Sequence, residues 1–358
     1  MPSLKEIKGR INSISSTLAI TSAMKMVASA KLQKAQMAIQ NMLPYERRLY
    51  SMLVDLMGAM NISAAASEDG SVRGSGSAER GFDQSGDRLS LSNRHDLAGM
   101  DGAYSLMAQR EVRKVAIVAF ASNSSLCGAF NSNVIREATA VINEYRASGL
   151  GDADITVYSV GRKMAEAMRK LGFPSPADFT RMSDSPSYEA ASALAQELLD
   201  GFVSGWFDKV ELVYNHYKST SSQPTTRQTY LPLSLADATA DLQAEKITDS
   251  ASETDTNRVA EPVGAPVVRQ GSPTTEDLIV EPSKEALIAT LLPKVIRLRI
   301  FTTLLDSAAA EHAARTVAMQ LATDNGNDLL QELTLEYNKG RQQKITSEIL
   351  DLVGGSMQ

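Results

Sequence analysis

The chain has 358 residues, a length that allows one large or two ordinary domains, and 43% of them are hydrophobic, enough for a sizeable core. A net charge of -6 at pH 7 gives no general attraction for nucleic acid or for an anionic membrane. The single cysteine, Cys127, excludes an internal disulfide and favours a reducing compartment. There is no run of about 18 apolar residues to predict a transmembrane helix, and the N-terminus lacks a signal-peptide pattern. We therefore expect a soluble protein without direct membrane insertion.

Residues 1–60 have the pattern of one long coiled-coil helix. Positions spaced alternately three and four apart form a heptad seam, and fourteen of its seventeen side chains are apolar. The apolar seam residues are Leu4, Ile7, Ile11, Ile14, Leu18, Ala28, Leu32, Ala35, Ile39, Met42, Leu49, Leu53, Leu56 and Met60. Pro44 is expected to kink or interrupt the helix. A seam that could extend roughly 85 Å needs a partner helix.

Residues 284–358 resume the helical pattern and supply that partner. Ser283 fits the N-cap position at the start of the helix. Apolar side chains recur at helical spacing, among them Leu287, Leu291, Val295, Leu298, Leu305, Leu330, Leu333, Tyr337, Ile345, Ile349 and Leu352. Two long helices at opposite ends of a chain, with a domain between them, predict an antiparallel coiled coil that grows out of that domain.

Residues 111–235 alternate strand and helix. Apolar, β-branched runs predict strands at 114–122, 153–161, 209–219 and 226–234, with the last two suited to a hairpin. Helices are predicted at 132–147, 162–171 and 187–203. This order predicts a mostly parallel sheet in a small Rossmann-like α/β domain. The fold class is therefore α/β, with a long antiparallel coiled coil of the terminal helices.

Two further segments have the composition of flexible insertions. Residues 61–110 are dominated by Ser, Gly, Ala and charged side chains. Residues 236–283 hold ten Asp and Glu against three Lys and Arg, which makes this insertion acidic. Neither segment carries enough apolar periodicity to predict a packed element.

Candidate catalytic groups are few. His95, His216 and His312 are spaced like neither a metal site nor a catalytic triad. Cys127 stands at a strand-to-helix turn, where a small buried residue is a commoner role than a nucleophile, and Gly128 suits the turn. Neither GxGxxG nor a Walker motif occurs, so we expect no cofactor and no active site. A coiled-coil adaptor with an α/β head, and a small-molecule enzyme with helical extensions, remain alternatives at this point.

Several motifs together resemble one family, the gamma subunit of F-type ATP synthases. The opening "LKEIKGRINSI" and "AITSAMKMVASAKLQKAQ" resemble its N-terminal helix, and "SLCGAFNSNV" (125–134) resembles its central motif. "VYNHYKSTSSQPTTRQTYLPL" (213–233) is similar to the segment of that family that ends in Leu-Pro-Leu. The stretch from "AAEHAARTVAMQ" to "ITSEILDLVGG" is similar to its C-terminal helix. The likeness covers about 260 residues in family order and leaves out only the two insertions.

The resemblance implies a central rotor stalk, which is not itself an enzyme. Its coiled coil would enter the head of alpha and beta subunits, one copy per three of each. Its α/β domain would form a foot that meets the epsilon subunit and the c-subunit ring of the membrane. The complex couples proton flow to ATP synthesis or hydrolysis. The implied place is the cytoplasmic side of the bacterial cell (inner) membrane, as a peripheral protein.

The resemblance also implies contact residues. Arg341 and Gln342 fall in a Tyr-Asn-Lys-x-Arg-Gln pattern and match a polar collar that grips a catalytic subunit. Met24 and Lys25 match the part of the N-terminal helix that is expected close to the same collar. The chain departs from the family at residues 123–125, where Asn-Ser-Ser replaces the usual Asp-Arg-Gly. Any role of that charged pair is therefore not expected here.

Overall fold

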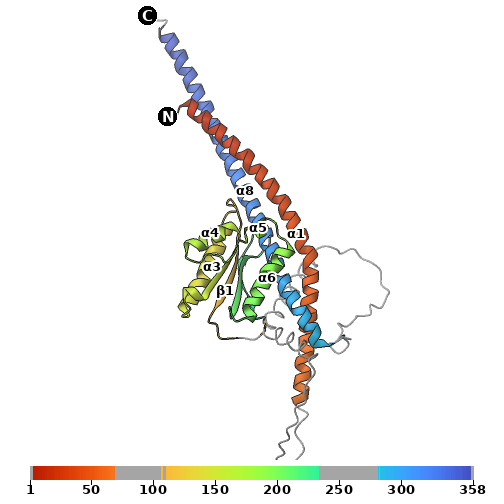
Figure 1. Ribbon diagram of the computed structural model, residues 1–358. Coiled ribbons are helices and arrows are strands. Elements are labelled where there is room, and N and C mark those ends of the chain that lie inside the picture. The colour runs from red at the N-terminus through yellow and green to blue at the C-terminus, as the bar shows by residue number, and fades with distance from the viewer. Residues whose placement is uncertain (1–2, 69–105, 108–109, 234–280, 282, 356–358) are drawn as a thin grey trace, which may run out of the picture.

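The computed structural model describes one elongated molecule in which a long helical shaft rises from a small α/β foot (Figure 1). The residues it describes are 3–68, 106–107, 110–233, 281 and 283–355. Most of the predicted insertions at 61–110 and 236–283 lie outside these residues.

Two long helices form the shaft. Helix α1 spans Leu4–Glu68, so it continues past residue 60, where we expected it to end, and helix α8 spans Lys284–Gly355. The two helices lie side by side and antiparallel over most of their length (Figure 1), which confirms the predicted coiled coil. Neither is interrupted at its internal proline, Pro44 in α1 and Pro293 in α8. Pro44 is exposed, so the backbone carbonyl that loses its hydrogen bond there can bond to water instead.

The heptad seam of α1 is the face that packs. Every seam position from Leu4 to Leu56 is buried or half-buried, including the polar residues Thr21, Lys25 and Glu46. The residues between them are mostly exposed. The apolar face that predicted a partner helix is therefore the face of α1 on which α8 lies.

The foot contains a four-stranded sheet of order β2-β1-β3-β4. Strand β1 spans Val115–Phe120, β2 spans Ile155–Val160, β3 spans Lys209–Asn215 and β4 spans Thr225–Leu231. Strands β2, β1 and β3 are parallel, and β4 pairs antiparallel with β3. The predicted parallel sheet and its hairpin at the edge are therefore confirmed.

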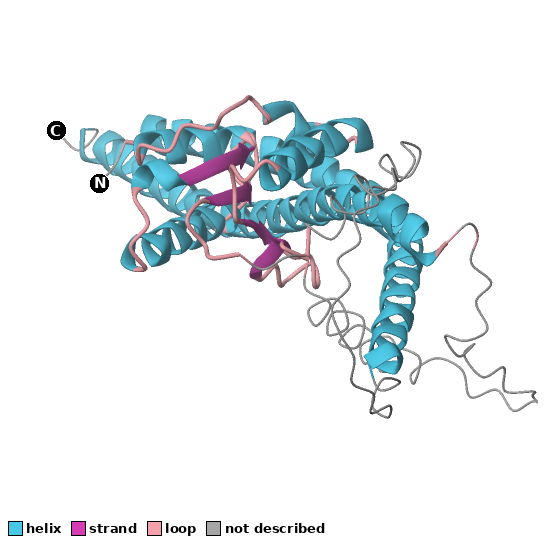
Figure 2. Ribbon diagram, turned by 60° about the horizontal axis from the view of Figure 1, so that its bottom comes forward, coloured by secondary structure: helices cyan, strands magenta, loops and turns pink. Residues whose placement is uncertain are grey.

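Helices cover both faces of this sheet (Figure 2). They are α3 (Phe130–Ala147), α4 (Arg162–Lys170), α5 (Thr180–Asp184) and α6 (Tyr188–Val203), with a short 3-10 turn at Asp152–Asp154. The sequence did not predict α5, because five residues are too few to show a helical period.

The strand alternation of β1 divides the core in two. Val115, Ile117 and Ala119 point to the side of α3 and α4, whereas the side chains between them point to α6 and α8. Helix α8 therefore takes part in two structures at once. The first part of α8 packs on the sheet as a layer of the foot, and the rest of α8 forms the shaft. The shaft is therefore packed directly against the sheet and is not connected to it by a loop alone.

Candidate functional site: the shaft and its collar

The register of the coiled coil fixes where each collar residue lies. Leu4 contacts Gly340, Leu18 contacts Gly326, and the hydroxyl of Thr323 donates to that of Thr21 over 3.1 Å. Helix α1 begins at Leu4, so α8 continues beyond this contact as a single helix. The C-terminal end of α8 therefore protrudes from the shaft without α1 beside it (Figure 1).

Two glycines let the helices approach closely. A Cβ atom at Gly326 would lie 2.6 Å from Cδ2 of Leu18, and one at Gly340 would lie 3.1 Å from Cδ2 of Leu4. Each glycine thus forms a notch for a leucine of the other helix. Gly340 weakens the helix by its propensity, but it also provides space for a packing contact, which the sequence did not reveal.

Arg341 and Gln342 follow this last notch. All side chains from 341 to 350 are exposed. Within the described part of the chain, the Arg341 guanidinium has no ion-pair partner. A charged, planar donor at the first unpaired turn of a protruding helix can form bidentate hydrogen bonds with a carboxylate or with backbone carbonyls of another chain.

Met24 and Lys25 lie elsewhere on the shaft. Both are half-buried; Lys25 is a seam position of α1, and Met24 stands next to it. The pairing of Thr21 with Thr323 places them beside α8 residues near 320. They are about twenty residues from Leu4 along α1, which is roughly 30 Å. The structure therefore does not bring the two predicted pairs together, and they occupy two levels of the shaft instead of one collar.

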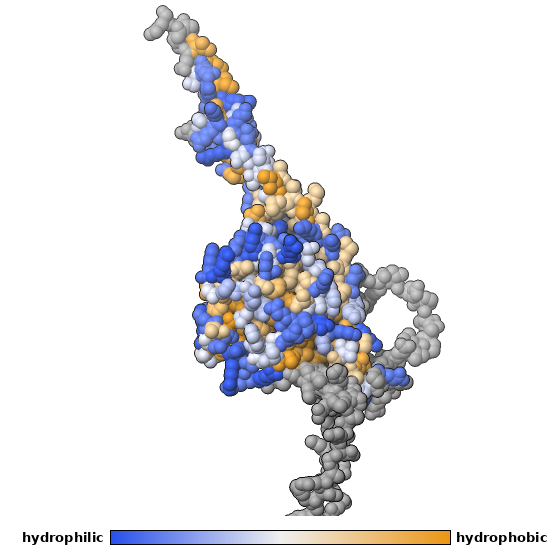
Figure 3. All heavy atoms as spheres, in the orientation of Figure 1, coloured by the Kyte–Doolittle hydropathy of each residue, from blue (hydrophilic) through white to orange (hydrophobic). Residues whose placement is uncertain are grey.

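The tip beyond the collar is apolar on its surface. Beyond the collar, Ile345, Ile349 and Leu350 are between 48% and 65% exposed. Before it, Leu335 is 65% exposed, whereas Leu333 is buried. Figure 3 shows hydrophobic surface near the end of the protruding helix, among polar side chains. Exposed apolar residues in this number on one short helix indicate a surface that another protein covers.

The foot lacks the ligand crevice of a typical α/β enzyme. In such sheets the crevice opens at the carboxyl ends of the strands, where the chain order reverses, here between β1 and β3. That place is filled by the loop after β1 and by α8. Cys127 and Phe130 pack on Ala310, and Gly128, at φ +57°, lies within van der Waals reach of Ala318. The shaft helix occupies the position in which an enzyme would bind its substrate.

Cys127 has a packing role in this loop. Its side chain is 1% exposed, and the amide of Asn131 donates to its sulfur over 3.1 Å. The same amide donates to the Ser122 hydroxyl, so the loop is closed on itself. No base is positioned to remove a proton from the thiol in the described part of the chain, which agrees with a turn residue rather than a nucleophile.

Asn123, one of the three residues that depart from the family motif, forms hydrogen bonds within the foot. Its amide nitrogen donates to the carbonyl of Thr180 over 2.8 Å, and its side-chain oxygen accepts from the backbone N–H of Arg162. The Arg162 guanidinium in turn donates to the Asn123 carbonyl over 2.7 Å. The uncharged residue thus ties β1 to α4 and α5 where the family usually carries an aspartate.

The two histidines that the structure describes form no common site. His95 lies outside the described residues, His216 bonds to Asp306 over 2.6 Å, and His312 is half-buried on α8. In the part of the chain that the structure covers, no three His, Cys, Asp or Glu side chains gather in a way that could hold a metal ion. None of the described helices is long and apolar enough to cross a membrane.

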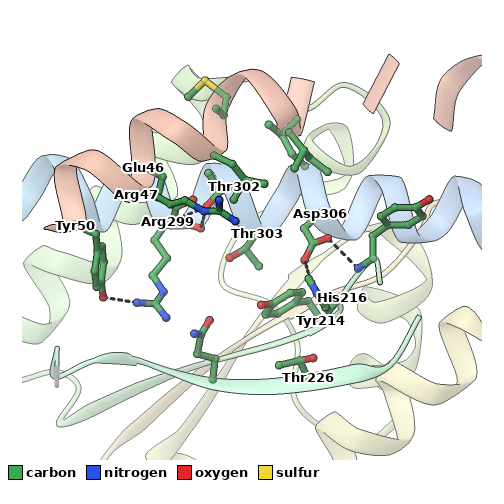
Figure 4. A pocket seen from close by; sticks show the side chains of 16 residues that line it. Glu46, Arg47, Tyr50, Tyr214, His216, Thr226, Arg299, Thr302, Thr303 and Asp306 are labelled. Carbon is green, nitrogen blue, oxygen red and sulfur yellow. Dashed lines mark hydrogen bonds and ion pairs between the residues drawn. The ribbon is translucent and has the colours of Figure 1, made fainter. Parts of the chain in front are cut away.

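A cavity of about 470 Å³ lies between α1, α8 and the sheet edge at β3 and β4 (Figure 4). Arg299 of α8 donates to the Tyr50 hydroxyl of α1, and Asp306 accepts from the backbone N–H of Tyr217 and from His216. The first bond joins the two helices of the shaft, and the bonds of Asp306 join the shaft to the foot. The polar groups of the cavity are arranged in pairs between elements and do not converge on one point, as those of a substrate site would.

A charge network in the foot was not predicted from the sequence. The carboxylate of Glu211, 1% exposed on β3, accepts from Arg227 over 2.6 Å and from the Tyr145 hydroxyl over 2.6 Å, and Lys209 lies 2.7 Å away. Burial alone would raise the pKa of Glu211, but the hydrogen bonds from Arg227, Lys209 and Tyr145 lower it. The network joins β3, β4 and α3. It stiffens the sheet edge without forming a reactive group.

Comparison with known proteins identifies the family. The family model described as ATP synthase matches residues 3–357. ATP synthase gamma chains of Phocaeicola vulgatus and Bacteroides thetaiotaomicron are 48% and 45% identical, each over the whole of both chains. That of Flavobacterium johnsoniae is 35% identical over 99% of this chain and 98% of its own.

The chain belongs to the ATP synthase gamma chain family. The resemblance derived from the sequence motifs is thereby confirmed, and the chain is a non-catalytic subunit of that complex. The relatives align from end to end, so the segments at 61–110 and 236–283 do not set this chain apart from them.

Solved structures support the same fold. A chain of the Euglena gracilis mitochondrial ATP synthase (OSCP/F1/c-ring, rotational state 3) matches with a TM-score of 0.54 at 19% identity, over 99% of this chain and 93% of that one. A chain of the Euglena rotor in rotational state 1 matches with a TM-score of 0.52 at 18% identity, over 96% and 98%. The likeness to these distant chains extends over the shaft and the foot together.

Proposed function

We propose that the chain is the central rotor stalk of an F-type ATP synthase, which couples proton flow through the membrane ring to ATP synthesis or hydrolysis on the catalytic subunits. The observation that carries the proposal is the single helix that protrudes past the end of α1, built on a foot whose ligand crevice is filled by that same helix. Such a chain offers a shaft and an anchor and no reaction centre of its own.

The proposed division of the chain into shaft, foot and insertions is the one predicted from the sequence. The helices predicted at 1–60 and 284–358 make the shaft, and α1 extends it to Glu68. Residues 111–235 make the foot, and most of the segments at 61–110 and 236–283 are insertions. The shaft meets three alpha and three beta subunits. The foot meets the epsilon subunit and the c-subunit ring. These partners place the chain on the cytoplasmic side of the bacterial inner membrane as a peripheral protein.

The mechanism is mechanical. A rotating shaft changes the conformation of a surrounding subunit only if it binds the alternative conformations with different free energies. The described shaft is asymmetric enough for this, because one side carries α1 and the other carries α8, and above Leu4 only α8 remains. Each orientation thus presents a different surface to three equivalent subunits.

The proposed contacts are at two levels. Arg341 and Gln342 bind a catalytic subunit near the tip, and Met24 and Lys25 do so further down the shaft. The exposure of residues 341–350 supports the upper contact. At the lower level Met26 and Val27 are 74% and 57% exposed on the outer face of α1, beside the proposed pair.

Isolation from native membranes tests the function. A tagged chain should copurify with the ATPase at one copy per three catalytic chains. Isolation as a free dimer would instead favour a coiled-coil adaptor and would refute the rotor.

Arg341→Ala tests the upper contact. We expect assembly to persist and coupled ATP turnover to fall, since a charge-assisted hydrogen bond contributes about 1.5–3 kcal/mol. The control is Lys339→Ala, because Lys339 is exposed two residues away and therefore faces the opposite side of α8. Equal turnover of both variants and the unaltered complex would remove Arg341 from the proposed contact.

A further inference from the structure

A buried carboxylate lies at the joint between shaft and foot. Glu311 of α8 is 7% exposed. It lines a small cavity together with Ser183 of α5 and with Phe120 and Val160, which end β1 and β2. On the opposite side of α8 the neighbouring turns pack against α1, where Leu32 contacts Ala313. Glu311 thus stands where α8 leaves the sheet and becomes the shaft.

The charges around Glu311 come from three helices. Arg315, one turn further along α8, donates from Nη2 to Oε1 of Glu311 over 2.8 Å. Lys31 of α1 and Asp184 of α5 act on the carboxylate through space, with opposite signs. His312 is the remaining titratable neighbour on α8. Arg315, Asp184 and Lys31 are thus the charged groups through which the three helices act on Glu311.

The hydrogen bonding of this cluster is incomplete. Nε of Arg315 and Nδ1 of His312 are buried, and neither has a hydrogen-bond partner in the described part of the chain. The guanidinium therefore holds the carboxylate with one nitrogen instead of the two that a bidentate pair uses. A buried ion pair with this geometry recovers only part of the cost of removing both charges from water.

The cluster favours an uncharged Glu311. Burial raises its pKa to about 7, with Asp184 adding to the rise, while Arg315 and Lys31 oppose it. His312 behaves in the opposite way, because burial and the cations Lys31 and Arg315 lower its pKa to about 4. Near neutral pH, Glu311 is thus the member of the cluster that changes charge.

We propose that Glu311 is a proton-responsive latch that fastens α8 to α5 and to the carboxyl ends of β1 and β2. With a proton, the side chain fits the small cavity as a neutral group. Without one, a carboxylate is confined beside Asp184 and is held by a single donor, so the joint opens more readily. The proposal concerns this chain alone, and it holds whether or not the chain turns inside a catalytic head.

The sign of the effect follows from the linkage of protonation to folding. A carboxyl whose pKa is higher in the folded than in the unfolded chain stabilises the folded state while it is protonated. That stabilisation is lost at a pH where the carboxyl is ionised in both states. The contribution of Glu311 is therefore full below about pH 4.5 and is lost as the pH rises through about 7. Between pH 5.5 and 8.5 the unfolding equilibrium of the joint should rise about 30-fold from this group.

Hydrogen exchange of the full-length chain measures this directly. After correction for the intrinsic rate, the ratio of exchange at pH 8.5 to exchange at pH 5.5, for amides of α5 and of α8 near Glu311, should be about 30-fold larger in the unaltered chain than in a chain without this ionisation. The variant Glu311→Gln, which cannot ionise, should lose that dependence. The control Glu332→Gln changes an exposed glutamate of the same helix and should keep it. The contribution of His312 is common to all three proteins and cancels.

Parallel pH profiles of the unaltered chain and Glu311→Gln would overturn the proposal. If Glu311→Gln does not fold, a measurement on the unaltered chain still tests the proposal. Carbon NMR of labelled glutamate carboxyls should then show one buried group that titrates near pH 7. A set that titrates entirely near pH 4.5 would equally refute the latch. Neither result depends on assembly with other subunits.

Discussion

Gly161 lies so close to the backbone of Ala121 that replacing it gives a quantitative prediction. Gly161 follows β2 and precedes α4, with φ +95° and ψ 144°, a combination essentially confined to glycine. A Cβ atom there would lie 2.1 Å from the carbonyl oxygen of Ala121, which follows β1. Real Cβ atoms do not come nearer than about 3.0 Å to such an atom, so Gly161→Ala must displace one strand end.

The cost has two parts. The unfavourable backbone conformation costs about 1–3 kcal/mol. Displacing Ala121 also disturbs two hydrogen bonds, one from its N–H to the carbonyl of Val160 over 2.8 Å and one from the Ser183 hydroxyl to its oxygen over 3.0 Å. Each contributes about 0.5–1.5 kcal/mol. We therefore expect Gly161→Ala to lose about 3–5 kcal/mol of foot stability.

Gly172→Ala is the matched control. Gly172 also has a positive φ, +91°, but no atom lies within 4 Å of the Cβ position. Gly172→Ala should cost only what its own positive φ costs a side chain, about 1–2 kcal/mol. The difference between the two variants isolates the clash with Ala121.

Hydrogen exchange of the β1 amides is the assay, because these amides open only when the foot unfolds. Gly161→Ala should accelerate their exchange by about 100-fold or more, and Gly172→Ala by about 10-fold. Equal acceleration in the two variants would refute the reasoning, since it would mean that the strand ends accommodate a methyl group without displacement.

Three further predictions concern the shaft and the foot. Glu211→Gln should cost about 1.5–3 kcal/mol at neutral pH, because it removes the charge-assisted bonds of this buried carboxylate with Arg227 and Lys209, although Arg227 keeps Glu144 as a partner. Since the pKa of Glu211 is lowered, its contribution is lost as the pH falls below about 4.5, and urea titrations of the two proteins should converge there. Cys127→Ala should cost about 1 kcal/mol and leave ATP turnover of the assembled complex unchanged, whereas loss of an activity without loss of assembly would revive an enzymatic role. Gly340→Ala should stabilise the tip by up to ~1 kcal/mol, because the end of Leu4 can move by a few tenths of an ångström, and faster amide exchange around 335–345 would contradict this.

The sequence predicted the architecture because its signals were long. A seam of sixteen positions from Leu4 to Leu56 repeats the same preference for a buried face, so local exceptions such as Thr21 and Lys25 do not hide it. The strands of the foot were found from β-branched runs, with ends that differ by a few residues from β1 and β3. The family followed from motifs distributed along the chain.

Spatial relations were harder to predict. The network of Glu211 joins Tyr145, Lys209 and Arg227, and only the register of β3 with β4 brings the last of these near. Similarly, the separation of Met24 from Arg341 depends on which residue of α1 meets which residue of α8. No periodic pattern specifies that register, because any shift by one heptad keeps the seam apolar.

The sequence left two roles open for the apolar residues of the C-terminal end. Ile345 and Ile349 continue the helical spacing and were expected to pack in the coil or to contact a surrounding protein. Since α1 begins opposite Gly340, the coil cannot include them, and they are about half exposed. The spacing of apolar residues predicts a face to be covered, but it does not say which chain covers it.

The shared role of α8 has a consequence for torsion. One uninterrupted backbone of 72 residues runs from the sheet to the tip, so a twist applied at one end reaches the other through a single ladder of hydrogen bonds. Beside the foot that ladder is braced by the sheet, along the coil it is braced by α1, and past Leu4 it has no brace from α1. The resistance to twisting should therefore fall stepwise toward the tip, which makes the end that lies furthest from the foot also the most compliant.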